Sequence, residues 1–550
     1  MTVPILTPRQ TSLNPATLEA LRASTAGGWQ PPAVPWAVKQ KTSYPVRAGN
    51  RVAILIDGAA AYAAIAQSFR AAKQFLYTTI SFGAPDFRLE RGSKDTFFSL
   101  LRDQAQAGVD VKAVIWKSGP TSTDTIPDPS AIPSVYPVNQ PGGKCIQARW
   151  DEAPGYSDWY RTPVANKEPF WVAFPAALGC HHQKTYIMDD GQGGVVAYVG
   201  GINPVQAYWD TPDHEVLDAG RVADVTSPAA TLSGLQRVPP LHDIFYRLTG
   251  PAVADVLANF IERYNGASER AMGNAVNTAV AIVPAAAAQI PALPDGVEVQ
   301  VLRTIAPGKY NSTPDGEQSI REVYFNLLQQ AGQGSIVYIE DQYFFDRGIL
   351  SQIQAAATRG AKVIIVIESA PDEGTLLGAV EQGLEQAMKW LDIFPLIQGH
   401  ANVTLLTLGN ASPDPRPGGS YIYSETYIHS KTMAVWNDLK AGFTGGSANI
   451  AFTSMWFHSE MNLVFADRSL ILDGVSRLWQ EHLNLDAATV NGLLQQPENA
   501  FNTFVRHAQA NLKAKNAGQS PDGRVYPWSP ETALGQPSLA GVPPSAIIAP

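Results

Sequence analysis

Two short stretches of the sequence place a lysine two positions after a histidine, in a chain that has only nine histidines. His182 and Lys184 occur in CHHQKTYIMDD, and His429 and Lys431 occur in YIHSKTMAV. A lysine ammonium can bind an oxyanion, and an imidazole can serve as a nucleophile or as a general acid. The repeated pair therefore indicates chemistry on one anionic group, such as a phosphate diester.

Each pair is followed at a similar distance by a glycine-rich turn and an asparagine. Asn203 lies 21 residues after His182 in VGGIN, and Asn449 lies 20 residues after His429 in TGGSAN. Glycine lets the backbone approach a ligand closely, and an asparagine amide can donate a hydrogen bond to an oxyanion. Two such segments brought face to face would place two histidines, two lysines and two asparagines around one phosphate.

The alternation of side chains along a strand decides which of these residues share a face. Residues two apart point to the same side, so His182 points with Lys184, and His429 points with Lys431. Asp189 lies five positions after Lys184. In a continued strand it would face the other way, and we expect it outside the pocket.

The segments around these motifs alternate between strand-like and helix-like patterns, and the order occurs twice. Gly108 and Gly360, 252 residues apart, end corresponding helices. We expect strands over 51–56, 74–82, 109–116, 335–344 and 361–369, and helices over 59–73, 94–108, 319–333 and 349–360. This duplication predicts an α/β (α+β) fold with two similar halves, each a mixed β-sheet flanked by helices, which form one pseudo-two-fold active site.

Composition and turn residues suggest how the chain is divided. An Ala/Pro-rich segment separates the halves, and Pro and Gly are frequent near the C-terminus. The expected parts are an N-terminal extension (1–50), a first half (51–270), a linker (271–300), a second half (301–512) and a Pro/Gly-rich tail (513–550).

The charge balance and the N-terminus bear on partners and location. The net charge of −9 disfavours general nucleic-acid binding, which depends on neutralising phosphates with Lys and Arg. The first residues lack the basic and apolar regions of a signal peptide, and no apolar stretch is long enough to span a membrane. We therefore expect a soluble chain, cytoplasmic as synthesised, that reaches any other compartment by a non-classical route.

The paired motifs resemble those of the phospholipase D superfamily, H-x-K-x4-D followed by G-[GS]-x-N. HQKTYIMD (182–189) matches in full, whereas HSKTMAVW (429–436) has Trp436 at the position of the last Asp. Further similarity includes HDIFYRLTGPAVADVLANFIERYN (242–265), YIEDQYF (338–344) and HSEMNLVF (458–465). These longer matches favour the phospholipase D branch over its small, single-repeat nuclease relatives.

The resemblance implies a two-step displacement that needs neither a metal nor another cofactor. In the usual order of the family, His182 attacks phosphorus to form a phosphohistidine, and His429 protonates the leaving alcohol and later activates water or an acceptor alcohol. Glu460 matches an acid that orients an imidazole, and Asp243 is the candidate counterpart. The groups expected to hold the non-bridging oxygens are Lys184, Lys431, Asn203 and Asn449.

The resemblance implies a phospholipid substrate at a membrane surface. The first hypothesis is hydrolysis of the distal phosphodiester bond of glycerophospholipids to phosphatidic acid and a free head group, with transphosphatidylation to alcohols as a second outcome. An alternative is an antibacterial phospholipase D effector exported by a type VI-like secretion system, with an immunity or secretion partner. A further alternative is another phosphodiesterase or a nuclease of the same superfamily.

His181, His458 and His214 each lie near a motif or near acidic residues. His181 is expected to support the site rather than to react, and His458 is expected either to be solvated or to line the pocket. His214 follows acidic residues in YWDTPDHE, but no second cluster with metal-ligand spacing accompanies it. The sequence therefore predicts no metal site.

Overall fold

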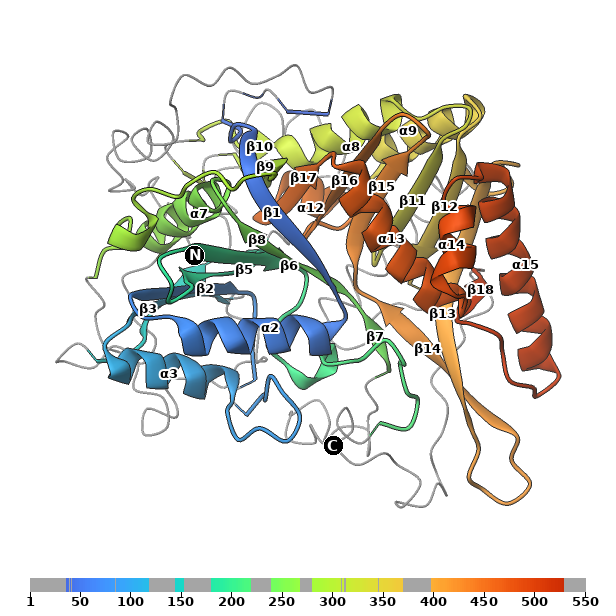
Figure 1. The fold of residues 1–550 in the computed structure, drawn as a ribbon, viewed down its shortest axis with the longest axis horizontal. Helices are drawn as coiled ribbons and strands as arrows, with labels where there is room; N and C mark the ends of the chain where they lie inside the picture. Colours follow the sequence, from blue (N-terminus) through green and yellow to red (C-terminus); the bar gives the residue numbers. More distant parts are fainter. Residues whose placement is uncertain are drawn as a thin grey trace, which may run out of the picture.

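The computed structural model describes residues 36–528 apart from 39, 41, 85, 118–143, 153–179, 219–238, 268–278, 308, 311–312, 345 and 369–396. Two mixed β-sheets form the centre, and helices cover them (Figure 1). This architecture confirms the mixed α/β fold. Most of the expected N-terminal extension and part of the expected tail lie outside the described residues.

The first sheet has the strand order β4, β3, β2, β5, β6, β8, β1. The pairs among β2, β3 and β4 are parallel, and the others are antiparallel. Its strands are β1 (Arg47–Ile56), β2 (Phe75–Ile80), β3 (Asp110–Lys117), β4 (Gln147–Glu152), β5 (Lys184–Asp189), β6 (Val195–Gly200) and β8 (Ile244–Thr249).

The second sheet repeats this order position by position, as β13, β12, β11, β15, β16, β17, β9. The short strands β10 (Glu317–Gln318) and β18 (Val525–Pro527) pair with β9 and β13 respectively. The seven repeated strands are β9 (Val297–Ile305), β11 (Ile336–Asp341), β12 (Lys362–Ile367), β13 (Val403–Pro413), β15 (Lys431–Trp436), β16 (Ala441–Gly446) and β17 (Glu460–Phe465). Consequently β5 and β15, which start at the two motif lysines, are equivalent strands.

Among the described residues, two pairings of named strands join the halves, and an isolated bridge between His181 and Ser459 also connects them. The start of β1 pairs with β9, while the rest of β1 pairs with β8, so one strand belongs to both sheets. In addition, β7 (Leu241–His242) runs parallel to the end of β14 (Tyr421–Ile428). This second pairing brings the residues just after β7 next to the second histidine–lysine motif.

The helices differ in the apolar core to which they contribute. In Figure 1, α2 and α3 lie along the first sheet, and α8 and α9 lie along the second. Side chains of α7, α13 and α15 share one apolar core with strands of both sheets. The helices are α2 (Gly58–Ala71), α3 (Phe97–Ala107), α7 (Val253–Gly266), α8 (Ser319–Gln329), α9 (Arg347–Thr358), α12 (Phe452–Trp456), α13 (Arg468–Leu483), α14 (Ala487–Leu493) and α15 (Pro497–Asn516), with the 3-10 turns η3 (Gln206–Tyr208) and η5 (Ala285–Ala287).

Local sequence explains where α3 begins and ends. Thr96 and Ser99 form a reciprocal capping box at its start, which satisfies backbone N–H groups that have no partner inside the helix. Gly108 follows its end with φ 97°, a left-handed conformation that glycine adopts without steric cost. The helix therefore stops where the sequence predicts, and β3 begins two residues later.

The C-terminal boundary differs from the expectation. The Pro/Gly-rich tail is expected to begin at residue 513, but α15 continues to Asn516, and β18, inside the expected tail, pairs with β13. The pairing aligns Leu406 with Pro527, more than one hundred residues apart, so local composition gives no sign of it. Similarly, β9 begins at Val297, inside the segment expected to be linker.

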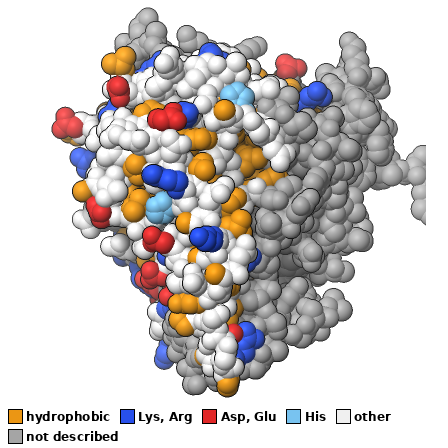
Figure 2. Space-filling model, turned by 90° about the vertical axis from the view of Figure 1, so that its right-hand side faces the viewer, with side chains coloured by type: hydrophobic (Ala, Val, Ile, Leu, Met, Phe, Trp, Pro, Cys, Tyr) orange, Lys and Arg blue, Asp and Glu red, His pale blue; other side chains and the backbone are white. Residues whose placement is uncertain are grey.

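One face of the molecule is mixed in charge. Figure 2 turns the right-hand side of Figure 1 toward the viewer, and on this face acidic and basic side chains are interspersed among polar and apolar ones.

Among the described helices, none combines the length and the apolar character that a membrane crossing requires.

Candidate active site

The two histidine–lysine motifs occupy equivalent positions immediately before and at the start of β5 and β15. Burial, together with the neighbouring charges of Lys431 and Lys184, lowers the pKa of His429 well below its ordinary value. The turn that follows the first motif lies against the second motif, because Gly200 pairs with Lys184 and the next residue, Gly201, lies beside His429. A small residue is required beside them, because a Cβ atom on Gly201 would lie 2.8 Å from an Asp243 oxygen and 3.3 Å from His429 Nδ1.

His182 is held by an acid from the other half of the chain. Its Nδ1 lies 2.9 Å from Glu460 Oε1, at the start of β17. Ser447 fixes the carboxylate, because its hydroxyl donates to Glu460 Oε2 at 2.6 Å. With Nδ1 as the donor, Nε2 keeps its lone pair, and the side chain is 19% exposed. This arrangement orients the ring and leaves Nε2 able to act as a nucleophile.

His429 is held in the reciprocal way. Its Nδ1 lies 2.6 Å from Asp243 Oδ2, in the first half, directly after β7. Its backbone N–H donates to the carbonyl of His242 at 2.8 Å, so the β7–β14 pairing fixes the residue as well. The ring packs edge-on against Tyr208, with centroids 4.7 Å apart. Glu460 and Asp243, both candidates from the sequence, thus each contact the histidine of the opposite half.

The two motif lysines have different partners. Lys431 Nζ donates to Gln342 Oε1 at 3.0 Å and to the carbonyl of His429. Lys184 is fully buried, and its Nζ has no hydrogen-bond partner among the described residues. Burial lowers the pKa of Lys184 to about 7. A buried ammonium without a partner is costly, and an anionic ligand would supply the missing acceptor.

The asparagines after the glycine turns are also buried. Asn203 Oδ1 accepts from the backbone N–H groups of Ser81 at 3.2 Å and Phe82 at 3.4 Å. Its Nδ2 has no partner among the described residues, so the amide is oriented with a donor left for a ligand. Asn449 is 3% exposed at the equivalent turn after β16, and its Oδ1 has no partner there either.

Asp189 and Trp436, which occupy the last position of the two motifs, lie outside this pocket. The alternation of side chains along a strand predicts this placement for Asp189. Asp189 accepts hydrogen bonds from the backbone N–H groups of Lys73, Gln74 and Phe75, and so fixes the connection between α2 and β2. Trp436 is buried, donates from Nε1 to the carbonyl of Leu494 at 2.9 Å, and packs 5.7 Å from the ring of Trp479. The motif position is therefore structural in both halves.

Exchange of the residue at this position should alter stability before catalysis. We expect Trp436→Asp to lower the free energy of unfolding by ~3–5 kcal/mol, because it empties a large buried site. We expect Asp189→Asn to cost ~1–3 kcal/mol, because the buried N–H groups lose a charged acceptor. Thermal unfolding and turnover by the folded fraction measure both effects. A stable Asp189→Asn protein without activity would place this position in the catalytic machinery instead.

Three further histidines lie in different surroundings. His181 is buried between Asp151, 3.0 Å from Nε2, and Ser459, 2.9 Å from Nδ1, which agrees with a supporting role. His458 is buried beside the pocket, with its ring 6.0 Å from that of His182. His214 lies in a different buried cluster of acids and histidines, and sequence spacing does not indicate this cluster because its members are distant from one another along the chain.

Three residues at the site were not predicted. Gln342, which contacts Lys431, lies in the stretch YIEDQYF. The similarity of this stretch to the phospholipase D superfamily could have indicated that Gln342 lies at the site. Ser447 occupies the G-[GS]-x-N motif, and its contact with Glu460 could have been considered from that position. Tyr208 packs on His429 from η3, and nothing local in the sequence indicates this contact.

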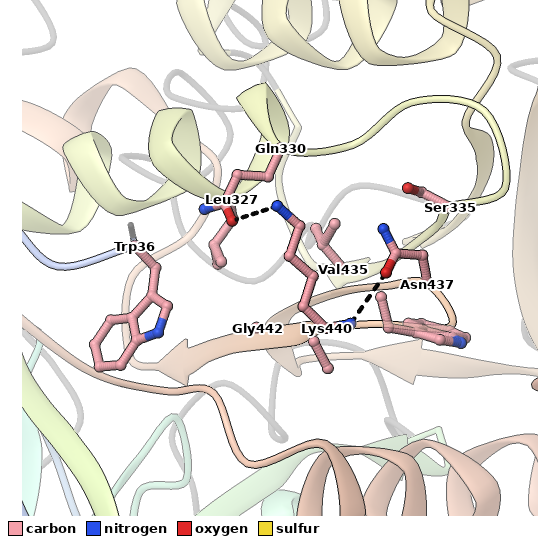
Figure 3. Close-up of a pocket in the computed structure, with 10 residues that line it drawn as sticks. Trp36, Leu327, Gln330, Ser335, Val435, Asn437, Lys440 and Gly442 are labelled. Atoms are coloured by element: carbon pink, nitrogen blue, oxygen red, sulfur yellow. Dashed lines mark hydrogen bonds between the residues drawn. The ribbon is translucent and has the colours of Figure 1, made fainter. Parts of the chain in front are cut away.

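A small pocket elsewhere is distinct from this site. It lies between α8 and the β15–β16 hairpin, and its lining includes Trp36, Leu327 and Lys440 but neither histidine–lysine pair (Figure 3). Lys440 Nζ crosses it and donates to Gln330 Oε1 at 3.2 Å. The pocket thus borders the outer end of the strand that carries Trp436.

Known proteins resemble the chain as follows. Residues 69–369 match the Phospholipase D (PLDc) family. Phospholipase D alpha 3 of Arabidopsis thaliana is 30% identical over 364 residues, which cover 51% of this chain and 44% of that protein. Phospholipase D alpha 2 of the same plant is 24% identical over 471 residues, which cover 69% and 56%. The chain spans about half the length of these curated relatives.

Among solved structures, phosphatidylserine synthase of Haemophilus influenzae Rd KW20 aligns with 85% of this chain and 95% of its own, with a TM-score of 0.47 and 14% identity.

The family match covers more than half of the sequence and includes the complete first motif with His182, Lys184 and Asn203. The protein therefore belongs to the phospholipase D family.

Proposed function

We propose that the protein hydrolyses the distal phosphodiester bond of glycerophospholipids and releases phosphatidic acid and the free head group. The observation that carries this proposal is the buried ammonium of Lys184, which has no partner among the described residues and lies beside two histidines that are each held by a carboxylate. This arrangement suits one anionic phosphate between a nucleophile and an acid. The lipid substrate is inferred from the names of the plant relatives.

The proposed reaction has two displacements. In the first, Nε2 of His182 attacks phosphorus, the bond from phosphorus to the head-group oxygen breaks, and that oxygen takes a proton from His429. Glu460 stabilises the positive charge that develops on the ring of His182. In the second, His429 accepts a proton from water, whose oxygen attacks phosphorus and releases His182. An alcohol in place of water gives transphosphatidylation.

The lysines and asparagines are proposed to stabilise the charge on the non-bridging oxygens. Lys184 Nζ and Asn203 Nδ2 are donors held in place before a ligand arrives, so little reorganisation is needed in the transition state. Lys431 is held by Gln342 and by the carbonyl of its own motif histidine. A phosphate would add an acceptor to these contacts.

Vesicle assays separate this activity from other phosphodiesterase reactions. Purified protein should release choline, ethanolamine or glycerol from the corresponding phosphatidyl lipids, with equal amounts of phosphatidic acid, and His182→Ala should not. With added butanol, phosphatidylbutanol would reveal transfer. Cleavage of plasmid DNA without any lipid product would contradict the proposal and favour a nuclease.

The pH dependence should have two limbs. Burial lowers the pKa of His182 to about 4, so this histidine is neutral and nucleophilic above that pH. Burial lowers the pKa of Lys184 to about 7 and raises that of Asp243 to about 7. We therefore expect kcat/KM to rise as pH passes 4 and to fall above 7, where Lys184 loses its charge and the Asp243–His429 pair loses a proton.

The shape of the alkaline limb tests this assignment. Loss of two protons makes the limb steeper than a single ionisation, with apparent pKa values that belong to the coupled groups. Lys184→Arg retains its charge throughout, so its limb should follow one ionisation. Initial rates on a soluble phosphodiester measure both profiles. A wild-type profile that stays flat from about pH 6 to pH 9 would contradict these titrations.

A further inference from the structure

A second group of buried polar side chains lies apart from the two motif pairs. Asp57 precedes α2, His214 follows η3, His242 ends β7 and Glu481 lies in the last turn of α13. All four side chains are almost completely buried. Each offers one nitrogen or oxygen atom, and these atoms lie within 4.8 Å of one another.

The spacing of these atoms suits a tetrahedral ion. His242 Nδ1 lies 3.0 Å from Asp57 Oδ1 and 3.1 Å from Glu481 Oε1. His214 Nε2 lies 3.1 Å from Glu481 Oε1 and 3.8 Å from Asp57 Oδ1. Bonds of ~2.0–2.2 Å to zinc separate the ligand atoms of a tetrahedron by about 3.3–3.5 Å. The four separations lie on both sides of that value.

Both imidazoles are also oriented as metal ligands are. The second nitrogen of His214, Nδ1, lies 3.0 Å from Asp210 Oδ2. The second nitrogen of His242, Nε2, lies 3.1 Å from Glu340 Oε2. A carboxylate on the distal nitrogen of a ligating histidine fixes its tautomer and strengthens it as a donor. Hydrogen bonding alone does not require this arrangement at both rings.

Backbone strain and an unpaired atom occur at the same place. The described chain has four non-glycine residues with positive φ, and two of them are Asp57 at 63° and His214 at 45°. Such conformations persist where the surrounding structure or a ligand compensates for them. Asp57 Oδ2 is buried and has no hydrogen-bond partner among the described residues. A cation beside this carboxylate would compensate for its burial.

We propose that Asp57, His214, His242 and Glu481 form a site for one divalent transition-metal ion of the zinc class. Two carboxylates and two neutral imidazoles are a suitable donor set for such an ion. The four ligands leave no position for water, so the ion has a structural role. The reaction proposed above does not use it, and the inference does not depend on that reaction.

The site would connect the two halves next to the candidate active site. Three ligands belong to the first half, whereas Glu481 belongs to α13 of the second. The carbonyl of His242 accepts hydrogen bonds from the backbone N–H groups of His429 at 2.8 Å and Ser430 at 3.2 Å. An ion on the ring of His242 would therefore fix the backbone that positions the second motif.

The competing interpretation is a network of charged hydrogen bonds. Although burial opposes the charged form, Asp57 and Asp210 raise the pKa of His214 to about 9. Protonated histidines could then balance the carboxylates without an ion. This interpretation predicts no metal uptake, so measurement of metal content decides between the two.

The test uses the full-length protein, dialysed against zinc and then against metal-free buffer. We expect one zinc per chain by mass spectrometry, a visible absorption spectrum of tetrahedral type after cobalt substitution, and a lower Tm after chelation. His214→Ala and Glu481→Gln should lose the metal. His400→Ala, which alters a histidine outside the cluster, should retain it.

A second control separates this site from the catalytic pair. His182, His458 and Glu460 also lie close enough to hold an ion. His182→Ala should nevertheless retain the zinc. Wild-type protein that takes up no zinc, and whose Tm responds to neither zinc nor chelator, would overturn the proposal even if the variants misfold. Zinc that is retained by His214→Ala and lost from His182→Ala would also overturn it.

Discussion

We expect His182→Ala and His429→Ala each to lower kcat by on the order of 10³-fold or more, because each removes a participant in both displacements. The double variant should be little worse than either single one, since residues that act as a unit lose their joint contribution once. Initial rates of head-group release from vesicles measure the effect. Multiplication of the two single effects in the double variant would contradict a shared reaction.

The same variants distinguish the roles of the two rings. His429→Ala should accumulate a phosphohistidine on His182 when the leaving group needs no acid, because the second displacement lacks its base. Mass spectrometry after rapid quenching can locate the adduct. An adduct on His429 of the wild-type protein would reverse the assignment of nucleophile and acid, whereas no adduct under any condition would contradict the covalent mechanism.

The second large effect is expected at Lys184, where activity and stability should change in opposite directions. Lys184→Met should lower kcat/KM by about 10²–10³-fold, because a prearranged donor to the phosphate is lost. The same substitution should raise Tm, because it replaces a buried charge that has no partner among the described residues with an apolar side chain of similar length. Thermal unfolding and initial rates, measured on the same preparation, test the two parts together.

Lys112 provides the matched control. It is also a buried lysine with a lowered pKa caused by burial, but its ammonium contacts Asp110. Lys112→Met should leave kcat/KM within a few-fold of wild type and should not raise Tm. If Lys184→Met is as destabilising as it is inactivating, the ammonium has a structural partner and the anion site proposed above is wrong.

The sequence predicts the elements of the fold well because most of them are locally determined. The apolar periodicity of α2, the capping residues of α3 and the β-branched residues of β12 agree with the packing of these elements. The boundaries of the two halves are harder to predict from the sequence. β18 is three residues long and depends on β13 for its hydrogen bonds, so the Pro- and Gly-rich sequence around it indicates only a loop.

The candidate site also contains residues whose placement the sequence predicts and contacts that it does not predict. The repeated spacing predicts that His182, Lys184 and Asn203 lie together, because strand alternation and one turn suffice to place them. Sequence spacing could not show which acid contacts which histidine, since that depends on how the halves pack. The cluster of Asp57, His214, His242 and Glu481 was missed for this reason: its members come from four elements, and no two are close enough in the sequence to form a metal motif.

The exchange of acids between the halves has an implication for the origin of the chain. Reciprocal contacts, in which each partner completes the site of the other, are what a two-fold symmetric dimer of identical subunits produces. In such a dimer every substitution appears twice. Here the equivalent strands end in Asp189 and Trp436, and the two histidines are held by Glu460 and Asp243. In a single polypeptide, by contrast, the two histidines can keep different carboxylate partners, so that the environment of each ring can be tuned separately.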